Sequence, residues 1–416
     1  MERLITLLGV VLILCVSWLW SSRRGHIPYR IIAWGLALQT LLVLFVLQVP
    51  FGASVFSAIG ESVTWFLSFA NHGAQFLFGN LASWKPEHQT LFGVQFALTI
   101  VPIIVFVSSV TAILYHTGVI QRVVRAMAWV MQRTMGTSAI ESLAAAANVF
   151  LGQTEAPLLI RHYLPRATSS ELFAIMVGGF ATIAGSIMGV YIALGIPATY
   201  LIVASLIAAP GSLVLAKIAE PNLVASDDHP VEVGDPVLPS TNMVDALARG
   251  AIDGFKIAAN VVVVLLAFTA LVALVDASLA WSAEHFVGWG WQGAPHSLDQ
   301  ILAFLFYPFA WITGVPQHEV ATLSSLLGVK ISQTEFLAYE KLADLIASGE
   351  LSQRTVTIAT VALCGFANVM SIGIQIGGFG IMVPEKRGEV ARLAVKAMCI
   401  GALANLMAAC IVGVFA

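Results

Sequence analysis

Apolar segments of about twenty residues recur along the whole of this chain, and each is long enough to cross a lipid bilayer as a helix. Only 10% of the 416 residues are charged, whereas roughly 25% are charged in a soluble domain. Transmembrane strands would need about ten residues of alternating polarity, and the sequence does not have that pattern. Because helices satisfy their own backbone hydrogen bonds inside a bilayer, the sequence predicts an all-α polytopic membrane protein.

The hydropathy predicts eight transmembrane helices, and a less apolar helix at 51–78 that lies along the membrane interface. The predicted spans cover residues 4–20, 31–49, 91–120, 172–196, 200–216, 252–277, 355–384 and 394–415. Arg23, Arg24 and Arg30 follow the first span closely, and positive residues favour the cytoplasmic side. We therefore expect a multi-pass inner-membrane protein with both termini outside, whose first apolar segment is a retained span and not a cleaved signal peptide.

The chain divides by composition into four parts. Residues 1–90 contain two spans and the interfacial helix, and residues 218–245 form a polar cytoplasmic linker rich in Pro and Asp. Segments 91–217 and 246–416 follow one plan: a span, a segment whose centre is too polar to cross cleanly, a glycine-rich span and a closing span. Because the two segments start on opposite sides of the membrane, they predict an inverted repeat, which is typical of secondary transporters with a midplane site.

The ten residues NVFLGQTEAP, at 148–157, place an acid, two amides and a hydroxyl inside an alanine-rich apolar stretch. Gly152 and Pro157 oppose a continuous helix, so we expect a re-entrant hairpin of two half-helices with its tip inside the protein. A carboxylate at Glu155 is costly within a membrane and therefore marks a functional site. The alternative is an ordinary cytoplasmic loop with Glu155 exposed, which the apolar flanks disfavour.

The triplet QTE at 333–335 repeats the triplet at 153–155, in the corresponding segment of the other half. The position of this repeat predicts a second re-entrant hairpin. The alternative is an external loop, since Lys330, Glu340 and Lys341 are close in the sequence.

Two glycine-rich spans carry polar side chains at helical spacing. Thr182 and Ser186 lie four residues apart, on one helical face, and Thr182 either faces a cavity or packs against a neighbouring helix. Asn368, Ser371 and Gln375 follow one stripe of an uncharged helix, where they either line a cavity or hold helices together. The glycines of this second span also permit a break in its helix.

Two hairpin tips and two broken helices are thus expected to converge at mid-membrane. They present two carboxylates, several amides and several hydroxyls, with Phe366 as an apolar wall. Because carboxylates accept hydrogen bonds and amides both donate and accept, this set suits a neutral ligand rich in hydroxyls and amide edges. An anionic ligand would call for Arg or Lys among these residues, and there is none.

At these residues the chain resembles the concentrative nucleoside transporter family. The motifs that carry the resemblance are GQTEAP at 152–157, TEF at 334–336 and CGFAN at 364–368, with a serine three residues after the asparagine. The resemblance covers nearly the whole chain. It implies a homotrimer of eight-span protomers in which spans one, two, three and six form a scaffold domain. The two hairpins and the other four spans would form a moving transport domain.

The family pattern also implies a role for thirteen residues of this sequence. The nucleobase would be held by Gln153, Thr154 and Glu155, with Ile187 packed on the base and Ile257 and Phe366 lining the same pocket. The ribose hydroxyls would be held by Glu335 and Asn368, and the 5′-hydroxyl end by Ser371. A sodium ion would be bound by the side chains of Asn148 and Thr182 and by the carbonyls of Leu151, Thr182 and Ile183.

Two positions depart from the family pattern. Thr334 stands where relatives often have Asn, and Thr182 stands where they have Ser at the ion site. Thr182 keeps the oxygen ligand, and Asn148, which proton-driven members tend to lack, is present. The resemblance therefore implies a sodium ion as the coupling ion and no other cofactor.

The predicted function is sodium-coupled uptake of nucleosides such as uridine by alternating access. Proton coupling through Glu155 or Glu335 is the first alternative. A membrane-embedded nucleoside hydrolase, with the same two carboxylates as an acid/base pair, is the second. The sequence contains neither H-E-x-x-H nor G-x-S-x-G, so we expect a carrier and not an enzyme. It also has no basic run of the kind that binds nucleic acid.

Overall fold

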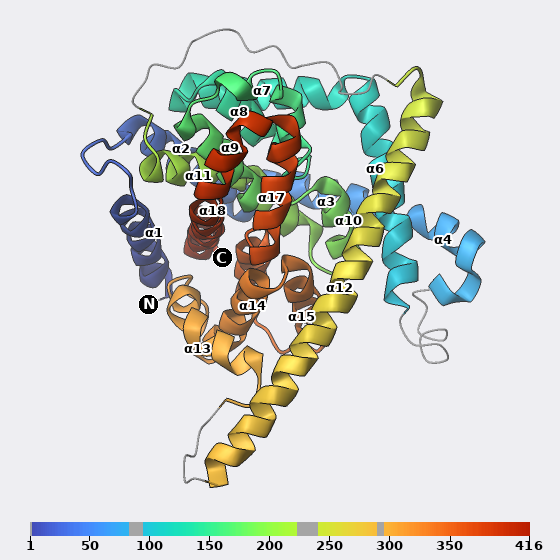
Figure 1. The fold of residues 1–416 in the computed structure, drawn as a ribbon, viewed down its shortest axis with the longest axis vertical. Helices are drawn as coiled ribbons and strands as arrows, with labels where there is room; N and C mark the ends of the chain where they lie inside the picture. Colours follow the sequence, from blue (N-terminus) through green and yellow to red (C-terminus); the bar gives the residue numbers. More distant parts are fainter. Residues whose placement is uncertain (1, 83–94, 223–239, 289–294) are drawn as a thin grey trace.

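The computed structural model describes residues 2–82, 95–222, 240–288 and 295–416 (Figure 1). Over these residues the regular secondary structure is helical and contains no strand, which confirms the all-α prediction. The predicted linker at 218–245 lies mostly outside the described residues, and only its two ends are described.

The N-terminal part consists of α1 (Glu2–Leu19), α2 (Tyr29–Gln48), α3 (Pro50–Ser68), α4 (Ala70–Phe78) and the short turn η1 (Gly79–Ala82). The first half then contains α6 (Phe96–His116), α7 (Val119–Met135), α8 (Ala139–Asn148), α9 (Ser169–Ala181), α10 (Gly185–Ala193) and α11 (Ala198–Ala219). Two 3-10 turns, η2 (Ala156–Ile160) and η3 (Leu164–Arg166), separate α8 from α9.

The second half repeats this order. It contains α12 (Met243–Gly288), α13 (Leu298–Trp311), α14 (Val320–Ser332), α15 (Glu335–Ala347), α16 (Gln353–Leu363), α17 (Val369–Met382) and α18 (Arg387–Phe415). The turn η4 (Gln317–Glu319) precedes α14, and η5 (Pro384–Lys386) precedes α18. In Figure 1, α7 and α8 lie at one end of the molecule and α13 and α14 at the other, so the two halves are inverted.

Eight helices in the described part of the chain are long and apolar enough to cross a membrane. Seven coincide with predicted spans. The eighth is the segment Pro50–Ala82, which we predicted to lie at the interface. The predicted span at 355–384 is instead divided into α16 and the short apolar helix α17.

Helices α1 and α2 pack against α18 and α11. A Cβ atom at Gly9 of α1 would come within 2.8 Å of Cys410 Sγ, and one at Gly35 of α2 within 2.1 Å of Val214 Cγ2. Helices α6 and α12 pack closely on one another, with Gly254 against the backbone of Val105. Hydropathy does not tell which faces of two apolar helices meet, so these contacts come from the structure alone.

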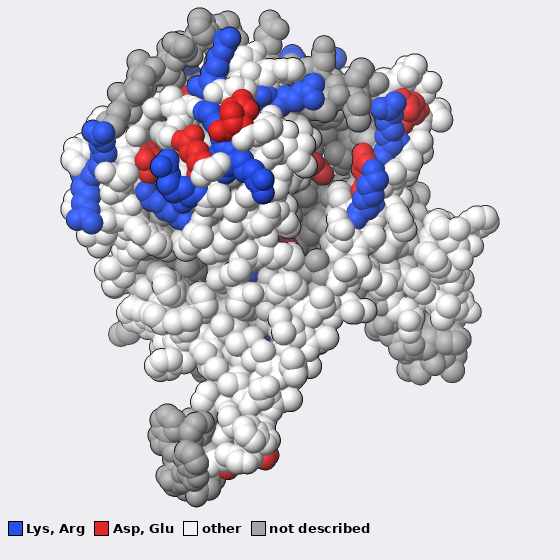
Figure 2. Space-filling model, viewed as in Figure 1, with Lys and Arg blue, Asp and Glu red and all other residues white. Residues whose placement is uncertain are grey.

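Basic side chains gather at one end of the molecule. Figure 2 shows most of the visible Lys and Arg side chains at the end where α7 and α8 lie, above a broad uncharged surface. Both chain termini lie away from this end in Figure 1.

Candidate functional site

The first hairpin turns inside the protein at the residues of the NVFLGQTEAP motif. Helix α8 begins with a capping box, in which Ser138 N donates to Glu141 Oε1 (2.7 Å), and it ends at Asn148. The chain then turns, and the backbone N–H of Gly152 donates to Glu155 Oε2 (3.2 Å). Because Glu155 is only half-buried and Gln153 is buried, the tip faces a hollow inside the protein and not open solvent.

The second hairpin turns at Gln333 and Thr334, between α14 and α15. The hydroxyl of Thr334 accepts a hydrogen bond from Leu337 N (3.3 Å) and so caps α15. Glu335 is therefore the first residue of α15, where a carboxylate is favoured by the helix dipole. Its side chain is buried, which excludes the external loop that was the alternative for this segment.

Each glycine-rich span is broken where it meets a hairpin tip. Helix α9 ends at Ala181 and α10 begins at Gly185, whose N–H donates to Phe150 O (3.0 Å) of the first hairpin. The expectation that Thr182 and Ser186 share one helical face was therefore wrong, because the break falls between them. Gly185 also has no room for a Cβ atom, which would lie 3.0 Å from that same carbonyl.

The second break brings the predicted binding residues of the two halves together. Helix α16 ends at Leu363, and Asn368 caps α17 by accepting a hydrogen bond from Ser371 N (2.8 Å). Asn368 therefore precedes the helix, and the prediction that it lies on one helical stripe with Ser371 and Gln375 was wrong for this residue. Within the break, Phe366 N donates to Thr182 O (3.2 Å). The two interrupted spans therefore touch at their breaks.

Glu335 is held by groups from both halves. Its Oε1 accepts from the hydroxyl of Tyr191 (3.1 Å) on α10, and its Oε2 accepts from Asn368 Nδ2 (2.8 Å). Tyr191 in turn stacks on Tyr339, with ring centroids 4.2 Å apart. The carboxylate is thus fixed in position at the edge of the hollow.

Gln153 is oriented by an amide network. Its Nε2 donates to Ser371 Oγ (3.2 Å), and its Oε1 accepts from Gln375 Nε2 (3.2 Å). Gln375 also donates to Met176 O (3.0 Å), which fixes its own amide. The network therefore decides which face of the Gln153 amide is presented to the hollow.

The hairpin tips and the breaks surround a central cavity of about 490 Å³. All nine residues predicted to bind substrate line this cavity: Gln153, Thr154, Glu155, Ile187, Ile257, Glu335, Phe366, Asn368 and Ser371. Its described lining contains two carboxylates and no Lys or Arg, which fits a neutral ligand. A cavity of this size and polarity is typical of a small-molecule site.

The cavity has further polar lining residues that the sequence analysis did not select. Asn260 of α12 is the clearest of them, and Ser186 of α10, which the sequence analysis named without giving it a role, also lines the cavity. The sequence does mark Asn260 as unusual, because it is a single amide followed by eight apolar residues. Without a motif around it, it could not be told from a residue that holds helices together.

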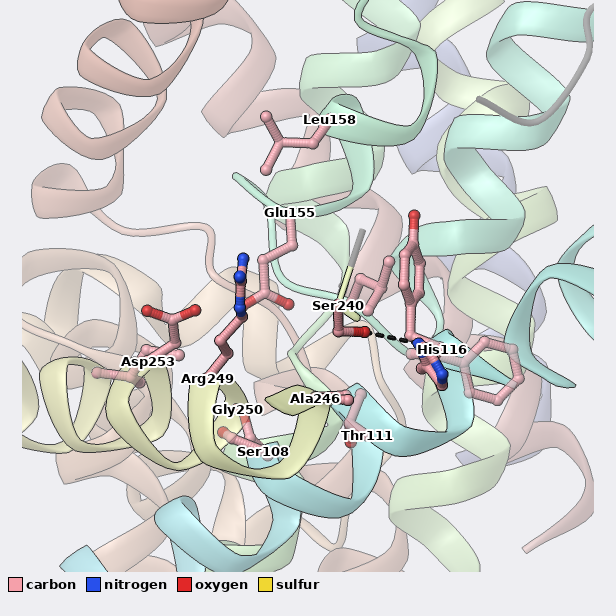
Figure 3. A pocket seen from close by; sticks show the side chains of 16 residues that line it. Ser108, Thr111, His116, Glu155, Leu158, Ser240, Ala246, Arg249, Gly250 and Asp253 are labelled. Atoms are coloured by element: carbon pink, nitrogen blue, oxygen red, sulfur yellow. Dashed lines mark hydrogen bonds between the residues drawn. The ribbon is translucent and has the colours of Figure 1, made fainter. Parts of the chain in front are cut away.

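A second hollow, of about 270 Å³, adjoins the central cavity at Glu155, Ser186 and Ile257 (Figure 3). Its other walls are the end of α6 and the first turns of α12. Figure 3 shows Glu155 near Arg249 and Asp253, and a hydrogen bond of 2.6 Å between Ser240 and His116. The shared residues make this hollow a vestibule on the side of the molecule where the basic residues gather.

Asn148 ends α8 with its side chain fully buried. Neither its Oδ1 nor its Nδ2 has a hydrogen-bond partner among the described residues, although an unpaired buried amide is costly. A Cβ atom at Gly178 would lie 3.1 Å from Nδ2, so the amide lies against α9. Thr182, whose hydroxyl donates to Gly178 O (2.8 Å), and Ile183 follow at the end of that helix.

These oxygens suit a hard monovalent cation. The described residues contain no group of three His, Cys, Asp or Glu side chains that could hold a transition metal. What they offer instead are an amide, a hydroxyl and backbone carbonyls at a helix end, which are the ligands that hard cations prefer. The unpaired Asn148 amide is the observation that fits an ion at this place.

Two inverted halves, two buried hairpin tips and a cavity with polar side chains at the helix breaks define a membrane carrier for a small neutral solute. Family models support this class. The model described as Na+ dependent nucleoside transporter C-terminus matches residues 200–413, the corresponding N-terminus model matches 8–81, and a nucleoside recognition model matches 97–198.

Similar proteins and structures agree. A transporter of Haemophilus influenzae is 41% identical, over 100% of this chain and 98% of that protein. The sodium/nucleoside cotransporter 1 of Mus musculus is 37% identical, over 99% of this chain and 64% of that longer protein. The structure of CNTnw in an inward-facing substrate-bound state has a TM-score of 0.91 at 41% identity, covering 99% of this chain and 98% of that one.

A CNTnw variant in an outward-facing state gives a TM-score of 0.93 at 40% identity, covering 100% of this chain and 99% of that one. The chain belongs to the Na+ dependent nucleoside transporter family. It is a nucleoside transporter of the bacterial concentrative type, embedded in the membrane, and it is not an enzyme. The hydrolase alternative is thereby excluded.

Proposed function

We propose that the protein is a symporter that couples the entry of sodium to the uptake of nucleosides such as uridine. The observation that carries this proposal is the convergence of all nine predicted substrate residues on one cavity, close in the chain to an unpaired buried amide. The names of the family model and of the mouse relative, which both specify sodium, support the choice of ion.

In this proposal the first hairpin binds the nucleobase. Gln153, Thr154 and Glu155 supply donors and acceptors for its polar edge. Ile187 and Ile257 are apolar members of the same lining and would pack on its faces. Since the Gln375 network fixes the Gln153 amide, it would also set which base edge is preferred.

The second hairpin and the break after α16 bind the ribose. Glu335 and Asn368 are already hydrogen-bonded to one another, so together they offer a fixed acceptor and donor pair for vicinal hydroxyls. Ser371 lies between this pair and Gln153, and it would meet the 5′-hydroxyl end. Phe366 would close the pocket between base and sugar.

Sodium would bind at the end of α8, to the side chains of Asn148 and Thr182 and the carbonyls of Leu151, Thr182 and Ile183. Four residues separate Asn148 from Gln153, so the ion would fix the turn that carries the base ligands. Because binding linkage is reciprocal, bound nucleoside must then tighten sodium by the factor by which sodium tightens nucleoside. A membrane potential of about 100 mV would give about 2.3 kcal/mol per sodium, or roughly fifty-fold accumulation.

The protein would lie in the inner membrane, with the end that carries the basic side chains on the cytoplasmic side and both termini outside. The vestibule of Figure 3 would then be the cytoplasmic approach to the cavity. Lipid would cover the uncharged belt, and three copies would assemble as a homotrimer, as the family resemblance implies. A scaffold that includes α6 and α12 would stay fixed while the hairpins move.

Uptake by purified protein in proteoliposomes tests this function. With radiolabelled uridine and an inward sodium gradient, we expect accumulation that vanishes when sodium is replaced by choline. Uptake that responds to an inward proton gradient and not to sodium would show that the coupling ion is the proton. That result would refute the sodium site and would not contradict the nucleoside site. Equal uridine affinity with and without sodium, measured by calorimetry, would refute the coupling through the Asn148 turn.

A further inference from the structure

Lys330 is a buried lysine that belongs neither to the lining of the cavity nor to the proposed ion site. It lies in the last turn of α14, in the second hairpin, and only 1% of its side chain is exposed. The ion pairs among the described residues do not include it. An ammonium group so far from water requires other compensation, because an uncompensated buried charge is very costly.

Oxygen atoms at a helix end provide this compensation. The Nζ of Lys330 donates to Ala362 O (2.8 Å) in the last turn of α16 and to Asn405 Oδ1 (2.7 Å) of α18. The last carbonyls of a helix lack helical partners and carry the negative end of its dipole. The C-terminal end of α16 therefore stabilises the ammonium in the way that it would stabilise a bound cation.

Asn405 connects this ammonium to both helix breaks. Its Nδ2 donates to Ala181 O and to Cys364 O, at 2.7 Å each. Because Lys330 is a donor only, it requires the oxygen of the amide and so directs the two N–H groups toward these carbonyls. Ala181 directly precedes Thr182 of the proposed sodium site, and Cys364 begins the turn that ends at the ribose ligand Asn368.

The position of Lys330 corresponds to that of the proposed sodium ion in the other half. In the first half, the ion lies between the end of α8 and the end of α9. In the second half, α14 and α16 take the places of those two helices in the repeat, and the ammonium lies between their ends. In the proposed function, each half would thus have a cation between its hairpin and its broken helix, and in the second half this cation would be covalently attached.

We propose that the Lys330 ammonium is the resident cation of the second hairpin and the positioning residue, through Asn405, for the two turns that carry the sodium and ribose ligands. This inference rests on the proposed function, since it concerns the same two binding turns. Lys330 does not touch the cavity, so its effect on ligands passes through the hydrogen bonds of Asn405.

The test measures sodium and uridine affinities of the purified full-length protein by calorimetry. Lys330→Met keeps the length of the side chain and removes its charge and its donors. We expect both affinities to weaken at least about tenfold, the usual effect of losing a hydrogen bond to a charged group. The matched control is Lys341→Met, which removes a lysine of the same hairpin that pairs with Asp299 (2.5 Å) on the surface, and it should leave both affinities unchanged.

A double-mutant cycle with Asn405→Ala tests the connection. If Lys330 acts through Asn405, the double variant should bind sodium no more than about twofold more weakly than the weaker single variant. Independent structural roles would give multiplied losses, of about a hundredfold, and would overturn the inference. If Lys330→Met does not purify as a folded protein, Asn405→Ala alone decides, because the same tenfold loss is expected of it.

Other results separate this inference from the proposed function. Affinities within twofold of the unaltered protein, in folded Lys330→Met or Asn405→Ala, would refute the positioning role while leaving the transport site intact. A loss in the Lys341→Met control as large as that in Lys330→Met would also refute it. If the unaltered protein binds no uridine at saturating sodium, the proposed function itself fails.

Discussion

Glu335, the proposed ribose ligand, gives the sharpest test of the cavity. Its carboxylate accepts from Tyr191 (3.1 Å) and Asn368 (2.8 Å), which leaves its remaining lone pairs for the hydroxyls of a ligand. Glu335→Gln keeps the shape and replaces one acceptor oxygen by a donor. The new NH₂ group points at a group that itself donates. This group is either Tyr191 or Asn368, or a ligand hydroxyl that donates to the carboxylate in the unaltered protein.

The expected loss follows from the bonds at stake. A hydrogen bond to a charged group contributes about 1.5–3 kcal/mol, which corresponds to roughly 10- to 150-fold in affinity. We therefore expect uridine to bind Glu335→Gln one to two orders of magnitude more weakly at saturating sodium, and uptake into proteoliposomes to fall accordingly. Sodium binding without nucleoside should stay within about twofold, since Glu335 is not among the proposed sodium ligands.

Deoxynucleosides show whether the lost bonds are those to the ribose. A deoxyuridine that lacks the hydroxyl held by Glu335 should bind the variant and the unaltered protein with nearly equal affinity, because the interaction is already missing. Glu340→Gln, on the same helix but outside the lining of the cavity, is the control for the loss of a carboxylate. Normal uridine affinity in folded Glu335→Gln would remove this residue from the site.

Three further predictions concern other parts of the molecule. Asn148→Ala should weaken sodium affinity at least tenfold while the ranking of purine and pyrimidine nucleosides stays the same; a changed ranking with unchanged sodium affinity would argue against the ion site. Gln375→Leu frees the Gln153 amide, so competition assays should show a shift in the preference among nucleobases, with sodium affinity within twofold. Glu319 lies outside the spans: burial raises the pKa of its carboxyl, and hydrogen bonds from Thr355 and Ser352 outweigh this, so its pKa in the folded protein is lowered. A lowered pKa contributes stability above the ordinary value that is lost as the pH falls, so Glu319→Gln should cost about 1–2 kcal/mol in thermal unfolding at pH 7 and less near pH 4.

The sequence predicted those parts of the site that interrupt an apolar pattern. Glu155 is polar where its flanks are apolar, and this contrast located the first hairpin tip, whereas the second was located by the repeat of the QTE triplet at the corresponding position of the other half. Composition also gave the helical class and the two-part plan, because the cost of unpaired backbone in lipid leaves few alternatives. The assignment of ligands to base, ribose and ion came from the family resemblance and not from these patterns.

Other features depended on packing, which a single sequence does not contain. The break after Ala181 was not located, because Thr182 and Ser186 have helical spacing and the competing hydrogen bond comes from Phe150, 35 positions upstream of Gly185. In the sequence, Lys330 indicated an exposed loop, because the partners that bury it could not be recognised. These partners, Ala362 and Asn405, are 32 and 75 residues away in the sequence. The placement of α1 and α2 against α18 and α11 likewise depends on which of several similar apolar faces fit together.

The breaks themselves give the proposed coupling of the ion and nucleoside sites a structural basis. A broken helix frees backbone groups that lipid cannot satisfy, so each break must find partners inside the protein. Here the breaks find partners in both halves: Phe366 N bonds to Thr182 O and Asn405 bonds to Ala181 O of the other half, and Asn405 also bonds to Cys364 O of its own half. In the proposed function, an ion that reorders the turn at Thr182 would therefore shift the turn that ends at Asn368, and a nucleoside held at Asn368 would resist the reverse shift. The proposed coupling of the two ligands would then follow from satisfying the backbone at two adjacent breaks, without any contact between ion and nucleoside.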